Sequence, residues 1–191
     1  EKPLRELILQ LRAGKKFAEI TDIPQTSYLT RKVPANENWK SIELVSHDIC
    51  LKDKKKYASN FRYVEEESNK MHGARLVQAV GDKYAVINPL YPPWSAEELD
   101  ATYTLPFTRL PHPKYKGKTI PAYEMIKFSV NLHRGCFGGC AFCTISAHQG
   151  KFVVSRSKQS ILEEVKKITE MPDFKGNLSD LGGPSANMYK M

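Results

Sequence analysis

Hydrophobic residues recur at helical spacing in two stretches of the first half of the chain. The first stretch has apolar residues at i, i+3, i+4 and i+7, namely Leu4, Leu7, Ile8 and Leu11. This stripe predicts an amphipathic helix that ends at Gly14. Further on, the spacing of Tyr57, Phe61 and Val64 predicts a second amphipathic helix over residues 51–68.

Four segments of the first half have the composition of β-strands. Residues 26–32 and 41–45 are short runs of this kind. Residues 75–80 and 83–88 are two further runs, joined by Gly81-Asp82. A two-residue connection that contains glycine is typical of hairpins, because glycine accepts a positive φ. The sequence therefore predicts a β-hairpin at this point.

A short helix and a linker are predicted beyond the hairpin. Ser95 and Glu98 have the S-x-x-E form of a capping box, so the helix should run over residues 96–103. Residues 106–121 are rich in proline and lysine and predict an extended crossover into a second unit. We place the boundary between the two units near Met125.

The second unit has the pattern of a βαβ motif. Residues 126–133 alternate apolar and polar side chains, which predicts a strand. Ser157 can cap a helix that ends at Pro172, with an apolar face made of Ile161, Leu162, Val165 and Ile168. Residues 177–181 predict a second strand. The expected fold class is α/β, preceded by an α+β segment that contains the hairpin.

The composition fits a folded domain and excludes a membrane span. The chain has 191 residues, of which 41% are hydrophobic and 26% are charged. No stretch approaches the roughly 18 uninterrupted apolar residues that a span requires. The formal net charge is +8. Because excess lysine usually forms a solvated surface, we expect any binding to RNA or DNA to be weak and indifferent to sequence.

Three of the four cysteines crowd into eight residues. Cys136, Cys140 and Cys143 have the spacing C-x3-C-x2-C, and the glycines of this segment stand at positions 135, 138 and 139. Glycine lets a backbone curl round a metal centre and direct sulfurs inward. Four cysteines normally close a cluster that only carries electrons, whereas three leave one iron open to a substrate. The grouping favours a metal site in a reducing cytoplasm.

The residues leave other interpretations of these cysteines open. A zinc site of three cysteines and one histidine is the first alternative, with His148 or His133 as the fourth ligand. Such a centre would suit a non-enzymatic zinc- or iron–sulfur-binding module that docks a nucleic acid or a protein. Cys50 stands far from the others beside apolar residues, so we expect it to be a core side chain.

The cysteine spacing, with Phe142 directly before the last cysteine, resembles the cluster loop of the radical S-adenosylmethionine (SAM) superfamily. The resemblance implies a 4Fe-4S cluster held by the three cysteines, SAM bound at the open iron, and a partial (β/α)6 barrel whose first strand precedes the loop. The backbone of Gly182 and Gly183 would contact the amino end of SAM, although Pro184 replaces the acid of the family motif. Phe142 would lie near the adenine.

Longer strings of residues narrow the resemblance to the YgiQ group of uncharacterised radical SAM proteins. These strings are residues 131–140, 148–150, 155–157, 180–184 and 186–189. By this resemblance, residues 1–125 form an α+β bridging segment that follows a further N-terminal domain. Residues 126–191 form the N-terminal part of a radical SAM domain. We therefore expect the sequence to be a fragment of a longer protein.

The activity that the resemblance implies is reductive cleavage of SAM to a 5′-deoxyadenosyl radical, which acts on an unknown substrate. A donor such as flavodoxin or ferredoxin would supply the electron. Residues that contact the substrate would come from later strands, so we assign no catalytic residue and expect the chain alone to be inactive. Arg134 and Arg156 would bind the SAM carboxylate or form surface ion pairs. His148 would contact cofactor or substrate, or make a backbone hydrogen bond.

Overall fold

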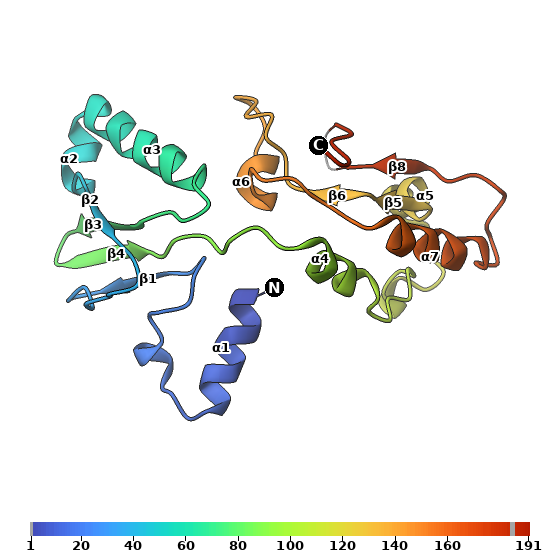
Figure 1. The fold of residues 1–191 in the computed structure, drawn as a ribbon, viewed down its shortest axis with the longest axis horizontal. Helices are drawn as coiled ribbons and strands as arrows, with labels where there is room; N and C mark the ends of the chain where they lie inside the picture. The colour runs from blue at the N-terminus through green and yellow to red at the C-terminus, as the bar shows by residue number, and fades with distance from the viewer. Residues whose placement is uncertain (1, 184–185) are drawn as a thin grey trace. The chain divides into compact units, whose positions relative to one another are not determined.

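The computed structural model describes residues 2–183 and 186–191, and its contacts divide the chain into two compact units that meet between Pro92 and Pro93 (Figure 1). The helices of the first unit are α1 (Lys2–Arg12), α2 (His47–Lys52) and α3 (Lys54–Ser68), and its strands are β1 (Ser27–Thr30), β2 (Ser41–Leu44), β3 (Arg75–Val80) and β4 (Lys83–Ile87). The helices of the second are α4 (Ala96–Tyr103), α5 (Pro121–Ile126), α6 (Ile145–Gln149) and α7 (Lys158–Thr169), and its strands are β5 (Ser129–Asn131), β6 (His133–Arg134), β7 (Val154–Ser155) and β8 (Asp180–Gly182). Short 3-10 turns lie at Phe17–Glu19 and Pro113–Tyr115.

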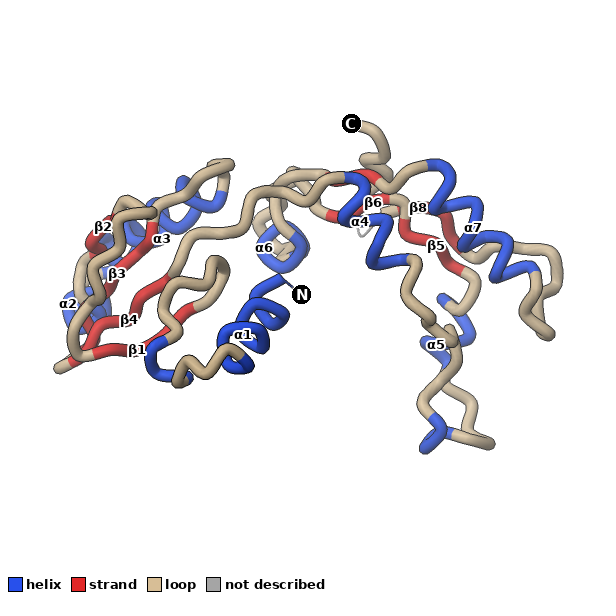
Figure 2. Tube along the Cα trace, turned by 60° about the horizontal axis from the view of Figure 1, so that its bottom comes forward, coloured by secondary structure: helices blue, strands red, loops and turns tan. Residues whose placement is uncertain are grey.

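The first unit is built on a mixed sheet with the strand order β1-β4-β3-β2. Strands β3 and β4 form the predicted hairpin, and its turn contains Gly81 with a φ of +56°. Strand β2 runs parallel to β3, and α2 and α3 make the connection between them on one side of the sheet (Figure 2). The hairpin and both short strands of the prediction are thus confirmed.

The helix predicted over residues 51–68 is wrong at its start. Asp53 has an extended backbone, with φ −128° and ψ 102°, and it separates α2 from α3. Its carboxylate accepts hydrogen bonds from the N–H groups of Lys55 and Lys56 at 2.8 and 3.3 Å. An aspartate that satisfies the first donors of a helix in this way favours a new helix start.

The buried face of α3 also differs from the one that an apolar stripe predicts. Tyr57 and Phe61 are 64% and 59% exposed, whereas Asn60 and Glu67 are buried. The Asn60 side chain accepts a hydrogen bond from Val45 N–H at 2.9 Å and donates one to Val45 O at 2.8 Å. The helix is therefore held to the end of β2 by polar contacts, and Tyr57 and Phe61 face outward.

Helix α4 confirms the prediction at both ends. The Ser95 hydroxyl accepts from Glu98 N–H at 3.1 Å, and the Glu98 carboxylate accepts from Ser95 N–H at 3.0 Å, which completes a capping box. The Asp100 side chain of this helix accepts a hydrogen bond from Ser157 N–H at 3.0 Å. Residues 93–125 thus pack with the βαβ motif in the second unit, and the division near Met125 stays a prediction.

The strand predicted over residues 126–133 is wrong in its bounds. Pro121 occupies the first turn of α5, and this helix extends to Ile126. The backbone then pairs as β5 with one sheet and as β6 with another. Leu132 lies between the two strands, where its N–H donates to Gly182 O at 2.7 Å and its carbonyl accepts from Arg156 N–H at 2.9 Å. The change of partner splits one predicted strand into two.

Strands β5 and β8 form the parallel pair of the predicted βαβ motif, with α7 in the connection between them (Figure 1). Val130 pairs with Leu181 and Asn131 with Gly182. Ser157 caps α7 as predicted, because its hydroxyl accepts from Ser160 N–H at 3.1 Å. Val130 is buried in this unit, as is Ile168 of α7. The α/β fold class is confirmed.

A buried ion network holds α7 to the start of the motif. Glu164 of α7 pairs with both Arg109 and Arg156. Arg109 also donates to the carbonyls of Lys127 and Ser129, the latter at 2.7 Å. The guanidinium of Arg156 is fully buried. It lies 3.7 Å from the centre of the Tyr103 ring. It also donates hydrogen bonds to the carbonyl oxygens of Asn131 in β5 and Ser160 in α7.

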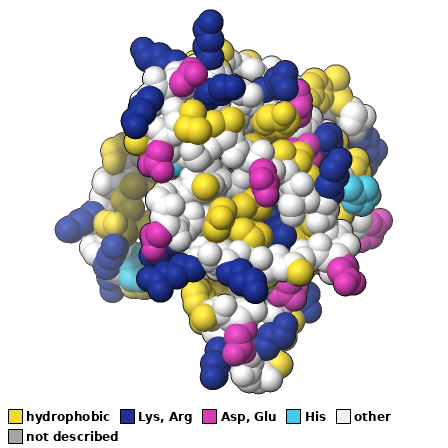
Figure 3. Space-filling view, turned by 90° about the vertical axis from the view of Figure 1, so that its left-hand side faces the viewer, with side chains coloured by type: hydrophobic (Ala, Val, Ile, Leu, Met, Phe, Trp, Pro, Cys, Tyr) yellow, Lys and Arg dark blue, Asp and Glu magenta, His cyan; other side chains and the backbone are white. Residues whose placement is uncertain are grey.

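The surface shown in Figure 3 mixes side chains of all kinds. Lysine and arginine lie scattered among acidic and hydrophobic residues on this face, and they do not form one continuous patch. This distribution agrees with a solvated basic surface. Within residues 2–183 and 186–191, none of the helices combines the length and the apolar character needed to cross a bilayer.

Replacing Glu164 by Gln should destabilise the protein strongly. The substitution leaves the buried charge of Arg156 without its counter-ion, so the free energy of unfolding should fall by about 3 kcal/mol. Urea denaturation measures the loss. Glu163→Gln is the matched control on the adjacent, exposed position, where the change should stay within about 0.5 kcal/mol. Equal losses in the two variants would contradict a role for the network.

Candidate functional site

The cysteine loop leaves β6 through a glycine that no other residue can replace without a clash. Gly135 is buried with a φ of +87°, and a Cβ atom there would lie 2.0 Å from the carbonyl oxygen of Phe152. The next residue is tied down as well, because Cys136 N–H donates to Gly150 O at 3.0 Å. The start of the loop is therefore packed against the segment that leads into β7.

Two sulfurs of the loop gather round Gly138. A Cβ atom at this glycine would lie 3.3 Å from Cys136 Sγ and 3.7 Å from Cys140 Sγ, so both sulfurs lie on the side that the missing side chain leaves open. Gly138 N–H also donates to Cys136 Sγ at 3.4 Å. Both sulfurs are therefore held beside the same glycine.

The third sulfur lies one turn further along the chain. Cys143 is half-buried, and its N–H donates to Cys140 O at 3.0 Å. In the described part of the chain, no three histidine, cysteine or acidic side chains lie close enough together to hold a metal ion. The adjacent Phe142 is 92% exposed, so its ring does not pack into the loop and remains accessible to a ligand.

The Gly-Gly turn lies at the same end of the motif as the cysteine loop. Gly182 is the last residue of β8 and pairs with Asn131, the last residue of β5. Strand β6 and the cysteine loop come shortly after Asn131 in the chain. Because parallel strands point the same way, the segments beyond their carboxyl ends meet at one edge. Gly183 follows directly and packs against His133, whereas Pro184 lies outside the described residues.

The two arginines considered as SAM ligands have different surroundings. Arg156 is fully buried in the ion network with Glu164, which corrects both the expected surface ion pair and a free carboxylate-binding role. Arg134 is exposed, and its Nε donates to the hydroxyl of Tyr103 at 3.2 Å. Arg134 therefore still presents its charge to solvent near the start of the loop.

The other cysteine and the two histidines considered as ligands lie in three different surroundings. Cys50 is buried in the first unit, where its Sγ accepts a hydrogen bond from the Asn60 amide at 3.2 Å, as expected of a core side chain. His133 is fully buried, and its contacts are to backbone groups and to Gly183. His148 lies in the last turn of the short helix α6 and is exposed.

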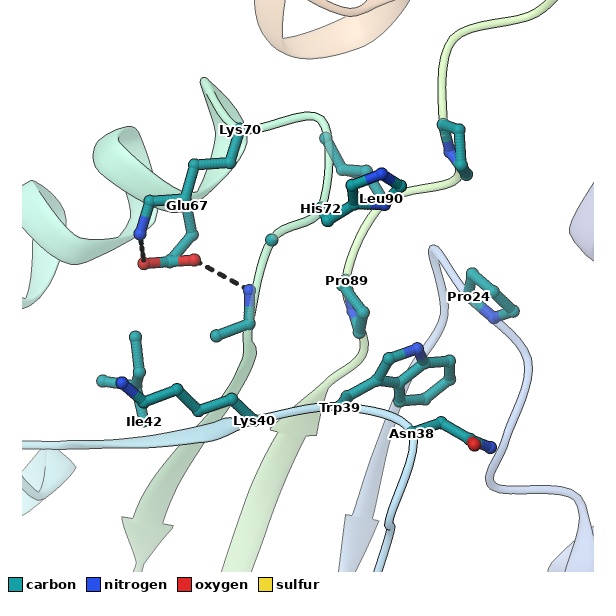
Figure 4. Close-up of a pocket in the computed structure, with 13 residues that line it drawn as sticks. Pro24, Asn38, Trp39, Lys40, Ile42, Glu67, Lys70, His72, Pro89 and Leu90 are labelled. Carbon is teal, nitrogen blue, oxygen red and sulfur yellow. Dashed lines mark hydrogen bonds and ion pairs between the residues drawn. The ribbon is translucent and has the colours of Figure 1, made fainter.

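A hollow of about 540 Å³ lies in the first unit (Figure 4). One wall is apolar, with Trp39 and Pro89, and the opposite side carries Glu67 and Lys70. Burial raises the pKa of Glu67, but hydrogen bonds from Lys70 and from Ala74 N–H, together with the charge of Lys70, outweigh burial and lower the pKa below its ordinary value. The acid is thus ionised and already satisfied by its neighbours, which makes it a structural group.

By its chemistry the donor set of the loop suits an iron–sulfur cluster, although among the described residues the three thiols are not gathered closely enough to hold a metal ion. Thiolates are the ligands that hold such clusters, and a set of three leaves one iron open. Two of the three sulfurs already border the space beside Gly138, where a Cβ atom is missing. His133, considered as a fourth, zinc-binding ligand, is buried with its ring packed on Gly183, and it is not part of any metal-binding group of three side chains within the described residues.

An α/β unit whose first strand leads into a three-cysteine loop, with a Gly-Gly turn after the parallel partner strand, is the arrangement of a radical SAM protein. The family model described as Radical SAM N-terminal matches residues 1–129, and the chain belongs to this family.

The chain is similar along its whole length to proteins of the UPF0313 group. It is 61% identical over 202 residues to a UPF0313 protein of Bacteroides thetaiotaomicron, 60% identical over 195 residues to one of Porphyromonas gingivalis, and 44% identical over 191 residues to one of Methanocella arvoryzae. Each match covers all of this chain, which spans 33%, 30% and 31% of the relatives' own lengths. No solved structure matches the chain.

The sequence pattern did not show three features of the site. The packing of His133 on Gly183 joins residues 50 positions apart, and no local spacing signals such a contact. The burial of Arg156 depends on its ion pair with Glu164, two turns into the next helix. The sequence contains many other acidic residues, and nothing in the local pattern singles out this one. The need for glycine at position 135 comes from the carbonyl of Phe152. The sequence indicated Gly135 for its backbone freedom, and the close approach of Phe152 adds a second reason for a glycine there.

Replacing Gly135 by Ala should destabilise the loop far more than a glycine replacement elsewhere. Gly117→Ala is the control, because Gly117 also has a positive φ but has open space around it. The control should lose about 1 kcal/mol from backbone strain alone, and Gly135→Ala roughly 1–3 kcal/mol more from the clash. Thermal denaturation compares the two. Losses of the same size would show that the contact with Phe152 is unimportant.

Replacing Glu67 by Gln should cost stability in a pH-dependent way. A carboxyl with a lowered pKa stabilises the fold fully above its unfolded pKa, and this contribution is lost as the pH falls through the folded pKa. The gap between wild type and Glu67→Gln should therefore be about 1–3 kcal/mol at pH 7 and should narrow below the ordinary carboxyl pKa of 4.5. Denaturation at several pH values measures it. The neighbouring, exposed Glu66→Gln should show no such trend.

Proposed function

We propose that this chain carries the cluster-binding and SAM-binding part of a radical SAM enzyme. Cys136, Cys140 and Cys143 would hold a 4Fe-4S cluster, and Gly182 and Gly183 would present their backbone to the amino end of SAM. The observation that supports this most strongly is the parallel pairing of Asn131 with Gly182, because it brings the cysteine loop and the Gly-Gly turn to one edge of the motif.

The chemistry would be the reductive cleavage of a carbon–sulfur bond. The cluster, when bound, supplies the electron that splits SAM into methionine and a 5′-deoxyadenosyl radical. The task of this chain would be to bind and orient SAM and to keep water away from the reacting atoms. The exposed ring of Phe142 would stack on the adenine, and Arg134 would offer its charge to the SAM carboxylate.

The electron donor and the substrate-binding groups would lie outside this chain. A reductant such as flavodoxin or ferredoxin would deliver the electron, in a reducing cytoplasm that keeps the thiols available. The chain spans about a third of its curated relatives, and the substrate-binding groups would lie in the part of a full-length protein that it does not include. The rest of a barrel would therefore select the substrate.

Cysteine replacements test this function in the full-length protein reconstituted without oxygen. Wild type and Cys50→Ala should each bind about four irons with an equal amount of sulfide. Cys140→Ala should lose most of the iron, and dithionite should then no longer produce 5′-deoxyadenosine from SAM. Cys50 is the matched control because it is a thiol buried in the other unit.

Two outcomes would contradict the proposal. One is a colourless wild-type protein with a single tightly held zinc. The other is an equal loss of iron in Cys50→Ala and Cys140→Ala.

A further inference from the structure

A buried histidine lies between the two halves of the proposed SAM site. His133 is the first residue of β6, directly before Arg134 and three positions before Cys136. Its side chain is fully buried, and none of the steps proposed above uses it. Burial of a group that can carry charge needs partners, so the contacts of the ring identify its role.

The first contact is with the Gly-Gly turn. A Cβ atom on Gly183 would lie 1.9 Å from Nε2 and 2.1 Å from Cε1 of His133, distances that no side chain can adopt. The φ of Gly183 lies outside the left-handed region, so its backbone conformation does not demand glycine. The imidazole is therefore the reason for a glycine at this position, since the ring occupies the space that a side chain would fill.

The second contact is with the segment beyond the turn. Nε2 accepts a hydrogen bond from Met188 N–H at 3.0 Å and lies 3.2 Å from the carbonyl oxygen of Ala186. The other ring nitrogen, Nδ1, has no hydrogen-bond partner within the described ranges. Met188 is itself buried. One ring thus touches the chain both at Gly183 and at residues 186–188.

We propose that His133 is a positioning residue of the SAM site, an inference that rests on the proposed function. The ring sets the distance between β6 and the Gly182–Gly183 backbone, and β6 leads straight into the cysteine loop. Loss of the ring would let the turn move relative to the cluster while the three cysteines stay intact. SAM affinity should therefore fall, and iron content should not.

The test compares SAM binding by full-length variants reconstituted without oxygen, followed by the change that SAM causes in the cluster spectrum. His133→Ala should keep its iron and raise the dissociation constant of SAM about tenfold or more, as expected for groups that orient a ligand-binding backbone. His133→Gln, whose amide oxygen can accept from Met188 N–H, should recover most of the affinity. His47→Ala, at an exposed position in the first unit, should bind SAM like wild type.

A double-mutant cycle tests the contact itself. Gly183→Ala should weaken SAM binding about tenfold in the wild-type background, because the methyl group and the ring compete for one space. In the His133→Ala background the same change should cost less than about twofold. Additive effects would overturn the inference. If His133→Ala fails to take up iron, Gly183→Ala decides alone: unchanged SAM affinity in that variant would also overturn it.

A measurement without the cluster separates this inference from the proposed function. In the protein free of iron, His133→Ala should speed the hydrogen exchange of the Met188 amide about tenfold or more, since its acceptor is gone. Unchanged exchange there would overturn the role of His133. Failure of the wild-type protein to bind iron or to respond to SAM would instead overturn the proposed function, whatever the exchange shows.

Discussion

The parallel pairing of β5 with β8 is the constraint on which the rest of the second unit depends. It comprises three residue pairs, from Ser129 with Asp180 to Asn131 with Gly182, and its register sets where the cysteine loop and the Gly-Gly turn begin. Because both strands run the same way, the loop that follows one and the turn that follows the other emerge at one edge. A register shift of one residue would turn the Val130 side chain to the opposite face of the sheet. It would also move the Gly-Gly turn away from the cysteine loop.

Side chains from distant parts of the chain hold this short pairing in place. Glu164 joins Arg109 and Arg156, and these arginines bond to backbone carbonyls of β5 and its flanks. His133 supports the other end of the pairing, where its ring fills the space over Gly183 and contacts the backbone of residues 186–188. Breaking either support leaves a buried polar group without a partner, which makes both contacts costly to lose.

The local elements were predictable from the sequence, and the contacts between them were not. The hairpin, the capped helix α4 and the βαβ motif have short-range signals, such as Gly81-Asp82 and the pair Ser95 and Glu98, and all three are confirmed. The break at Asp53 comes from its carboxylate, which caps the start of α3. The outward face of α3 depends on the polar contact of Asn60 with the end of β2, so the apolar spacing predicted the wrong buried face. The cysteine spacing indicated the family that the comparisons show, whereas the packing of His133 and Arg156 involves partners that only the fold brings near.

The central claim is that the cysteine loop and the Gly-Gly turn act as one binding site. Amide hydrogen exchange on the reconstituted full-length protein tests it most directly, with SAM as the only variable. We expect SAM to slow exchange in residues 136–143 and at Gly182 and Gly183 together, while exchange in the β3–β4 hairpin is unchanged. Slower exchange in the cysteine loop with no change at the turn would contradict the claim.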